Sequence, residues 1–264
     1  MAGPTTAERG AAAQESSGPP LVRRLGPRRL RRIIILAVVV LLLGSGCVWT
    51  LYGSQWLRVE RVSVSGTAVL TPGQVREAAA VPVGSPLVSV DTGAIESRLM
   101  RSLPRIDQVD VERSWPDGIV LKVTERTPVL LVRRGGEFVE VDDEGVRFAT
   151  VARAPKGVPL LEIATGSAES ATASLRRFGE TRLVREAVRV AGDLPPAVSR
   201  ATRTVTVRSF DDISLKLGDG RTVGWGSSEQ GVAKARALTA LMKAAPDADH
   251  FDVSVPTAPA SSGS

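Results

Sequence analysis

The amino-acid sequence predicts an α+β protein that one helix anchors in a membrane. Two observations lead to this fold class: an apolar stretch without charges near the N-terminus, and a long region after it in which short strands and amphipathic helices follow one another. The expected order is a disordered basic tail at 1–32, a transmembrane helix at 33–52, a compact α+β domain at 57–126, a mixed β-sheet domain with flanking helices at 127–256, and a disordered tail at 257–264.

The apolar stretch from Ile33 to Leu51 fits the thickness of a bilayer. As a helix its 19 residues span about 28 Å, close to the roughly 30 Å of a hydrocarbon core. Trp49, Tyr52 and Trp56 lie at its C-terminal end, where aromatic rings prefer the membrane interface. We therefore expect one membrane-spanning helix.

Arginines crowd the N-terminal side of this stretch, and positively charged flanks stay on the cytoplasmic face of a membrane. The sequence thus predicts a single-pass protein of the cell membrane, with a cytoplasmic N-terminus and C-terminal domains outside. The arginines assigned to this topology signal are Arg23, Arg24, Arg28, Arg29, Arg31 and Arg32.

A cleaved signal peptide has the same layout of charges followed by apolar residues. The small residues Gly44, Ser45 and Gly46 before Cys47 also resemble a lipoprotein signal, although Gly44 stands where such signals usually carry a branched apolar residue. A lipid-anchored binding module is therefore the alternative to a permanent membrane helix. A mature chain that begins at or near Cys47 would be the sign of it.

Composition limits the chemistry of the exported region. The chain has a net charge of +6, but residues 1–32 hold seven arginines and two glutamates, a net of +5, so the rest is close to +1. A nucleic-acid-binding domain would carry its own basic excess, and none is expected here. Cys47 and His250 are the only cysteine and histidine, which argues against a zinc site, and the acidic run 142–144 is interpreted as a solvated turn in preference to a calcium site. We expect no cofactor.

The first exported domain begins with a strand predicted at 57–64. A bulge is expected in it, because its apolar residues change phase between Val59 and Val62. Thr71 is predicted to cap a short helix in which Gln74 completes a capping box.

A brief extended piece is expected at 87–90, followed by a helix that Asp91 or Thr92 caps. A hairpin follows, with its turn at 114–118, because apolar residues alternate with polar ones on both sides of that turn. The order of elements is strand, helix, helix, strand, strand. The apolar face of the second helix consists of Ile95, Leu99 and Leu103.

Several short segments of this region resemble one family. They are VERVSVSG at 59–66, G-x-P-L-x-x-V-D at 84–91 and the run at 103–129, within which R-x-W-P at 113–116 and E-R-x-P at 125–128 are the most specific. In order and spacing, directly after a membrane helix, they are similar to the cell-division protein family FtsQ/DivIB. The resemblance implies a POTRA domain at 57–126 and an FtsQ-type β domain at 127–256. With 29 arginines against 5 lysines, it also implies a high-GC Gram-positive source.

The second domain is expected to open with three short strands and to continue with a long helix at 171–191, in which Leu175, Leu183, Val184 and Val188 face inward. Ser227 is predicted to cap a last helix, with Gln230 in a capping box and an apolar stripe of Val232, Ala235, Leu238 and Met242. The strands are expected at 129–132, 138–141, 146–150, 204–208, 213–217 and 250–256.

No nucleophile elbow, phosphate loop or zinc motif occurs in the sequence, so we do not expect an enzyme. The resemblance implies a divisome scaffold at the division septum. It would bind the small coiled-coil proteins FtsB and FtsL and thereby help to control septal peptidoglycan synthesis by FtsW and FtsI. Another POTRA-bearing binding module of the cell envelope is the alternative.

The last strand is the candidate site for these partners, because an open sheet edge accepts an extended segment through backbone hydrogen bonds. One set of its alternating side chains would pack on the core and the other would help to select the partner. The candidate edge strand consists of Phe251, Asp252, Val253, Ser254 and Val255, and further candidate contacts are Trp225, Lys234 and Arg236.

Overall fold

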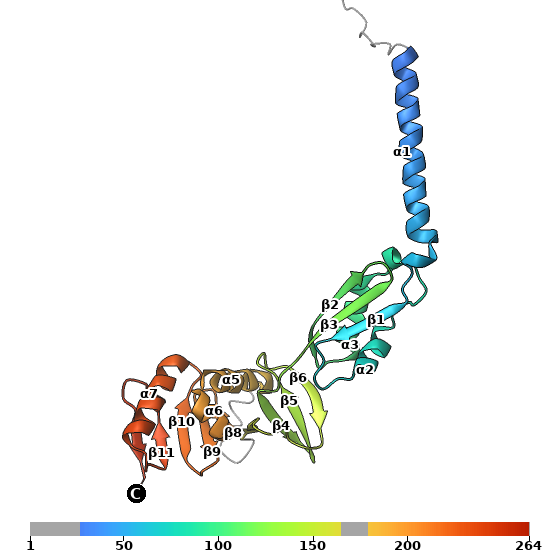
Figure 1. Cartoon of the computed structure of the whole chain (residues 1–264). Helices are drawn as coiled ribbons and strands as arrows, with labels where there is room; N and C mark the ends of the chain where they lie inside the picture. The colour runs from blue at the N-terminus through green and yellow to red at the C-terminus, as the bar shows by residue number, and fades with distance from the viewer. Residues whose placement is uncertain (1–26, 165–178, 264) are drawn as a thin grey trace, which may run out of the picture. The chain divides into compact units, whose positions relative to one another are not determined.

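The computed structural model describes residues 27–164 and 179–263. The chain divides into two compact units, with the boundary between Ser54 and Gln55. The first unit contains one long helix and the second contains both globular domains (Figure 1).

Helix α1 spans Pro27–Gly53. Within it, Arg31–Gly53 is a stretch of 23 residues that is long and apolar enough to cross a membrane, and none of its residues is buried inside the protein. The helix begins earlier than predicted, so the expectation of disorder is wrong for residues 27–32. Proline is favoured at the first position of a helix and arginine is a good helix former, which extends α1 through the basic flank. Arg23 and Arg24 lie outside the described residues.

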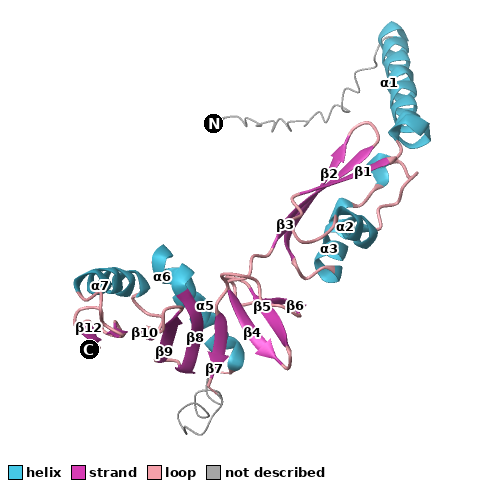
Figure 2. Ribbon diagram, turned by 60° about the horizontal axis from the view of Figure 1, so that its bottom comes forward, coloured by secondary structure: helices cyan, strands magenta, loops and turns pink. Residues whose placement is uncertain are grey.

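The first globular domain is a three-stranded sheet with two helices that pack on it and on each other (Figure 2). The strand order is β1-β3-β2, with β1 parallel and β2 antiparallel to the central strand β3. Its core is formed from the inward face of the sheet and the apolar stripes of the helices. The elements are β1 (Arg61–Ser65), α2 (Pro72–Ala79), α3 (Thr92–Ser102), β2 (Ile106–Ser114) and β3 (Gly118–Glu125), with 3-10 turns at Gln55–Leu57 and Leu87–Ser89.

Both predicted helix caps are present in this domain. Thr71 and Gln74 form the full capping box of α2, and the Asp91 carboxylate accepts a hydrogen bond from the amide of Ala94 at 2.9 Å. Because these side chains act within one turn of their own helix, local sequence is enough to specify them.

Two expectations about this domain are wrong. The strand predicted at 57–64 is two separate pairings: Val59 exchanges backbone hydrogen bonds with Gly84 and Ser85, whereas β1 pairs with β3. The apolar residues change from one face to the other because Val59 pairs with Gly84 and Ser85, whereas the residues of β1 pair with β3. No bulge is needed to explain the change. The extended piece expected at 87–90 is a 3-10 turn, in which the amide and hydroxyl of Ser89 both donate to the carbonyl of Pro86.

The second globular domain is a mixed sheet of nine strands in the order β12-β11-β10-β9-β8-β7-β4-β5-β6. Helix α5 packs on β7 and β8 and touches α7, and one large hydrophobic core lies between the helices and the sheet. The elements are β4 (Leu130–Arg134), β5 (Glu137–Val141), β6 (Arg147–Val151), β7 (Leu160–Ile163), α5 (Glu180–Asp193), α6 (Pro196–Ala201), β8 (Thr202–Ser209), β9 (Asp212–Leu217), β10 (Thr222–Gly226), α7 (Gly231–Ala244), β11 (His250–Asp252) and β12 (Ala260–Ser262).

The helices of this domain differ in part from expectation. Residues 171–178 of the predicted long helix, Leu175 among them, lie outside the described residues, and α5 begins after Gly179. Its inward residues are as predicted, since Leu183, Val184 and Val188 are buried.

Helix α7 does not start with the predicted cap. Gln230 occupies the N-cap position in a left-handed conformation and makes no side-chain cap, so the capping box of Ser227 and Gln230 is wrong. Three residues of the predicted stripe face the core, since Leu238 is buried and Ala235 and Met242 pack against it. The prediction is wrong for Val232, which is 62% exposed, and Lys234 is buried.

Candidate functional site

The C-terminal end of the nine-stranded sheet is built by a strand-helix-strand unit. Helix α7 carries the chain from the end of β10 back to the start of β11, so the two strands pair in parallel. Thr222 lies opposite His250 and Gly224 lies opposite Asp252. The unit places β11 outside β10, as the second strand from the end of the sheet.

The inward side chains of this unit belong to the core. Phe251, Val253 and Trp225 are all fully buried, and the guanidinium of Arg221 lies 5.8 Å from the centre of the Phe251 ring. The predicted alternation therefore holds for Phe251 and Val253. Trp225, predicted as a partner contact, has no exposed surface in this conformation, and it supports the strand from inside.

The outward backbone of β11 belongs to its even-numbered residues. The carbonyl of Asp249 accepts a hydrogen bond from Thr222, and the amide of Val253 donates to the carbonyl of Gly224 at 2.9 Å. Because strand residues bond alternately to either side, the backbone groups of His250 and Asp252 point away from β10. These two residues carry the groups that an added strand would use.

A further strand already covers this edge. The tail turns back through a hydrogen bond between the amide of Ala258 and the carbonyl of Val255, and β12 pairs antiparallel with β11. The expectation of a disordered tail at 257–264 is therefore wrong for Ala260–Ser262. The strand predicted at 250–256 is also shorter than expected, because β11 ends at Asp252 and Val255 is 55% exposed beyond it.

Sequence reasoning missed β12 because its residues give no strand signal. Ala260, Ser261 and Ser262 are small, and all three are exposed, so no apolar alternation marks them. The local signal in the sequence is the turn around Pro256, which returns the chain to β11.

The charged groups around this edge are partly buried. The ammonium group of Lys234 donates a hydrogen bond to the carbonyl of Ser227 at 2.8 Å, and burial lowers the pKa of Lys234, while the charges of Glu229, Asp211 and Asp252 oppose that shift. Only 2% of Lys234 is exposed, so its predicted contact with a partner would need a rearrangement.

Two other charged candidate residues, Arg236 and Asp252, are more accessible than Lys234. Arg236 on α7 is exposed. Asp252 is half-buried, and hydrogen bonds from Ser254 lower the pKa of its carboxyl group. Among the candidate residues, Arg236, Asp252 and Ser254 are thus the polar ones that solvent reaches.

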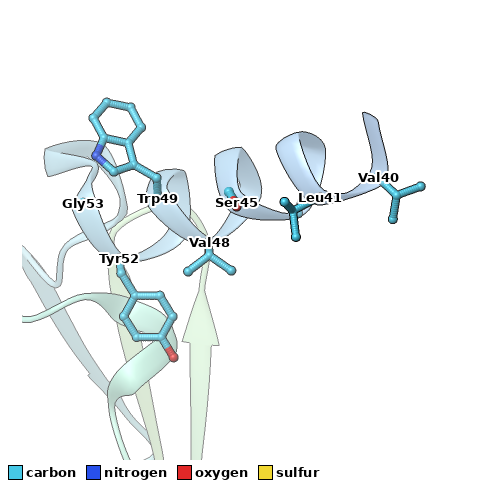
Figure 3. A pocket seen from close by; sticks show the side chains of 8 residues that line it. Val40, Leu41, Ser45, Val48, Trp49, Tyr52 and Gly53 are labelled. Carbon is cyan, nitrogen blue, oxygen red and sulfur yellow. The ribbon is translucent and has the colours of Figure 1, made fainter. Parts of the chain in front are cut away.

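Helix α1 has a separate apolar face, which Figure 3 shows from close by. The small residues Gly44 and Ser45 form a shallow depression on this face, between the larger side chains of Leu41 and Val48. Trp49 and Tyr52 lie on the same face toward the C-terminal end of the helix. Helix α1 runs past Cys47 without a break and ends at Gly53.

Family models match most of the chain that follows α1. A model described as "POTRA domain, FtsQ-type" matches residues 57–126, and one described as "Cell division protein FtsQ/DivIB, C-terminal" matches residues 130–254. The second match ends at residue 254 and so does not include β12, the strand that covers the edge of β11.

Individual relatives agree with these matches. The chain is 73% identical to "Cell division protein FtsQ" of Streptomyces collinus and 75% identical to that of Streptomyces coelicolor, over 264 residues and the full length of both proteins. It is 32% identical to the protein of the same name from Mycolicibacterium smegmatis over 210 residues, which are 79% of this chain and 58% of the relative.

Proposed function

The chain belongs to the FtsQ/DivIB family of cell-division proteins, and we propose that it acts there as a membrane-anchored scaffold. In this role α1 spans the cell membrane with its N-terminus in the cytoplasm, and both globular domains lie outside. The scaffold binds small coiled-coil division proteins of the FtsB and FtsL types. Through them it helps to control septal peptidoglycan synthesis by the FtsW and FtsI pair.

We further propose that the outward edge of β11 is the partner-binding site. The observation that carries this proposal is that the edge accepts an extended segment whose side chains are all exposed. Backbone hydrogen bonds alone therefore suffice for pairing there, and this is how a partner strand would add to the sheet. Asp252 and Ser254 lie at the end of this edge and would help to select the partner.

A fluorescent fusion tests the scaffold role in dividing cells. We expect the full-length fusion to concentrate at division septa, because a scaffold for septal synthesis acts where the septum forms. A fusion that carries only residues 1–54 is the control for membrane insertion alone. An even distribution of the full-length fusion around the membrane of dividing cells would contradict the proposed role.

A pair of substitutions at His250 tests the site. His250→Pro removes the outward amide and leaves the hydrogen bonds to β10 in place, whereas His250→Ala keeps the amide and removes the same side chain. Both are made in the chain ended at Pro256, where β12 does not compete. We expect His250→Pro to weaken binding of the purified FtsB-type protein of the same bacterium roughly tenfold, the equivalent of one lost hydrogen bond.

The result is read against His250→Ala. Since His250 Nδ1 lies 2.9 Å from the hydroxyl of Thr222, both variants lose that side-chain contact equally. Equal partner affinities for the two variants, with circular dichroism spectra of a folded protein, would rule out the outward edge of β11 as the site.

A further inference from the structure

We propose that the C-terminal tail is an intramolecular competitor for the β11 edge, which a partner strand must displace. This inference rests on the proposed partner-binding site at that edge. It starts from the position of β12: Ala260 lies opposite Asp252 and Ser262 lies opposite His250, so β12 uses the two residues whose backbone groups point outward. A partner strand and β12 cannot pair with those groups at the same time.

The tail is seated on the edge at a defined place. Its chain reverses at the hydrogen bond between Ala258 and Val255, and Gly263 then lies against the backbone of Ala248 and Asp249. A Cβ atom at Gly263 would approach the amide nitrogen of Asp249 to 2.5 Å, so the approach requires a glycine. The register of β12 is thus fixed at both of its ends.

The tail is held weakly enough to be displaced. All three residues of β12 are exposed, so the pairing gains backbone hydrogen bonds and buries no apolar side chain. Each of those bonds stabilises the closed tail only modestly, and the entropy lost on ordering the tail residues offsets part of that gain. We expect the closed tail to outnumber the open tail on the order of tenfold, and the apparent affinity for a partner to fall by the same factor.

The tail follows the part of the chain that the family model for the C-terminal domain matches. The family model for the C-terminal domain matches residues 130–254 and does not include β12. The two Streptomyces relatives align over all 264 residues, so they share a tail of this length.

Hydrogen exchange tests the pairing first, in the full-length chain in detergent micelles and in the same chain ended at Pro256. The amides of His250 and Asp252 should exchange about tenfold faster once the tail is removed, because they face β12. The amide of Val253 is the internal control, since it donates to Gly224 in both proteins. Equal exchange at His250 and Asp252 in both proteins would overturn the tail proposal and leave the proposed scaffold role untouched.

A disulfide then tests the competition. His250 and Ser262 are directly opposite and both exposed, so His250→Cys with Ser262→Cys in a Cys47→Ser background is designed to lock the tail in place. The oxidised protein should lose binding of the FtsB-type protein, and reduction should restore it. The chain ended at Pro256 should bind roughly tenfold more tightly than the full chain, in agreement with the exchange ratio.

The outcomes separate the two proposals. Slower exchange at His250 and Asp252 in the full chain, with partner binding that neither the lock nor the truncation changes, would mean that the partner binds elsewhere. That result would overturn both the competition and the site proposed at β11. Slower exchange together with loss of binding in the locked protein supports both.

Discussion

Two short segments that mark the family have clear tasks in the first globular domain. Arg113, of the R-x-W-P segment, donates hydrogen bonds to the carbonyls of Leu87 at 3.1 Å and Val90 at 2.6 Å, and so fixes the 3-10 turn to β2. Glu125, of the E-R-x-P segment, accepts hydrogen bonds from three successive amides, those of Ala68, Val69 and Leu70. Both side chains thus bond to backbone groups that lie outside the strands of the sheet.

Asp252 and Ser254 form a similar local unit at the end of β11. The amide of Ser254 donates to the Asp252 carboxylate at 2.9 Å, and the hydroxyl and amide of Ser254, helped by the charges of His250 and Lys234, lower the pKa of that carboxyl group. A carboxyl group whose pKa is lower in the folded state stabilises the fold above its unfolded pKa, about 3.9, and this stabilisation is lost as the pH falls through the folded pKa.

Substitution of Ser254 tests this link between charge and stability. We expect Ser254→Ala to raise the pKa of Asp252 toward its ordinary value, because one donor to the carboxylate is lost. The variant should be less stable than the native protein above about pH 4, and the difference should shrink as the pH falls further. Carboxyl carbon chemical shifts give the pKa, and denaturant unfolding at several pH values gives the stability. An unchanged Asp252 pKa would contradict the assignment.

Among the elements, β1 shows how one residue ends a strand. Gly66 follows Ser65 with φ of +84°, and a Cβ atom there would lie 2.0 Å from the carbonyl oxygen of Val123 on the neighbouring β3. The chain leaves the sheet at this point because only glycine combines that backbone conformation with so close an approach.

A comparison of two glycines separates the two effects. Gly84 has the same φ of +84°, but no atom lies within 4 Å of the Cβ position. We expect Gly84→Ala to destabilise by about 1 kcal/mol, the strain of a left-handed backbone, and Gly66→Ala by about 3 kcal/mol or more, because β1 and β3 must also move apart. Denaturant unfolding of both variants measures the difference. Equal losses would show that the sheet accommodates a side chain at Gly66.

Elements specified by near neighbours could be predicted from the sequence, and those specified by distant ones could not. The capping box of Thr71 and Gln74 lies within one helical turn, and the inward Phe251 and Val253 follow from alternation against a core. Strand β12 forms because β11 offers an unpaired edge, and its own residues have little strand preference.

At the candidate site, too, distant residues determine what the sequence pattern does not predict. Lys234 is buried among charges contributed by Asp211, Glu229 and Asp252, which are far apart along the sequence. A basic residue on a predicted helix is ordinarily expected at the surface, so neither its burial nor that of Trp225 was indicated by local pattern.

At the scale of the whole molecule, ion pairs join the two globular domains. Arg126, directly after β3, pairs with Asp142 beyond β5 and lies 3.3 Å from Asp107 of β2. Arg105 pairs in the same way with Glu140 of β5, and Asp142 and Glu140 are both buried. The hydrogen bond and charge of Asp142 raise the pKa of Arg126 despite its partial burial. The acidic run 142–144 was expected to be a solvated turn, and this is wrong for Asp142, which is buried and paired with Arg126.

Loss of Arg126 should therefore weaken the connection between the domains. Arg126→Ala leaves the Asp142 carboxylate with the amides of Glu144 and Val146 but without its cation. Removing one member of a buried ion pair is costly, and we expect the free energy of unfolding to fall by about 3 kcal/mol. Arg126→Lys should fall between this variant and the native protein, because it keeps the charge and loses the planar fork.

The matched control is Lys122→Ala, since Lys122 and Glu112 form a pair whose side chains are 51% and 48% exposed. Solvent screens such a pair, so this variant should unfold like the native protein. Denaturant unfolding of the full-length chain in detergent micelles compares all three variants, and exchange of the Val129 amide, which donates to Val141, reports on the junction itself. If Arg126→Ala unfolds like Lys122→Ala, the ion pairs do not hold the domains together.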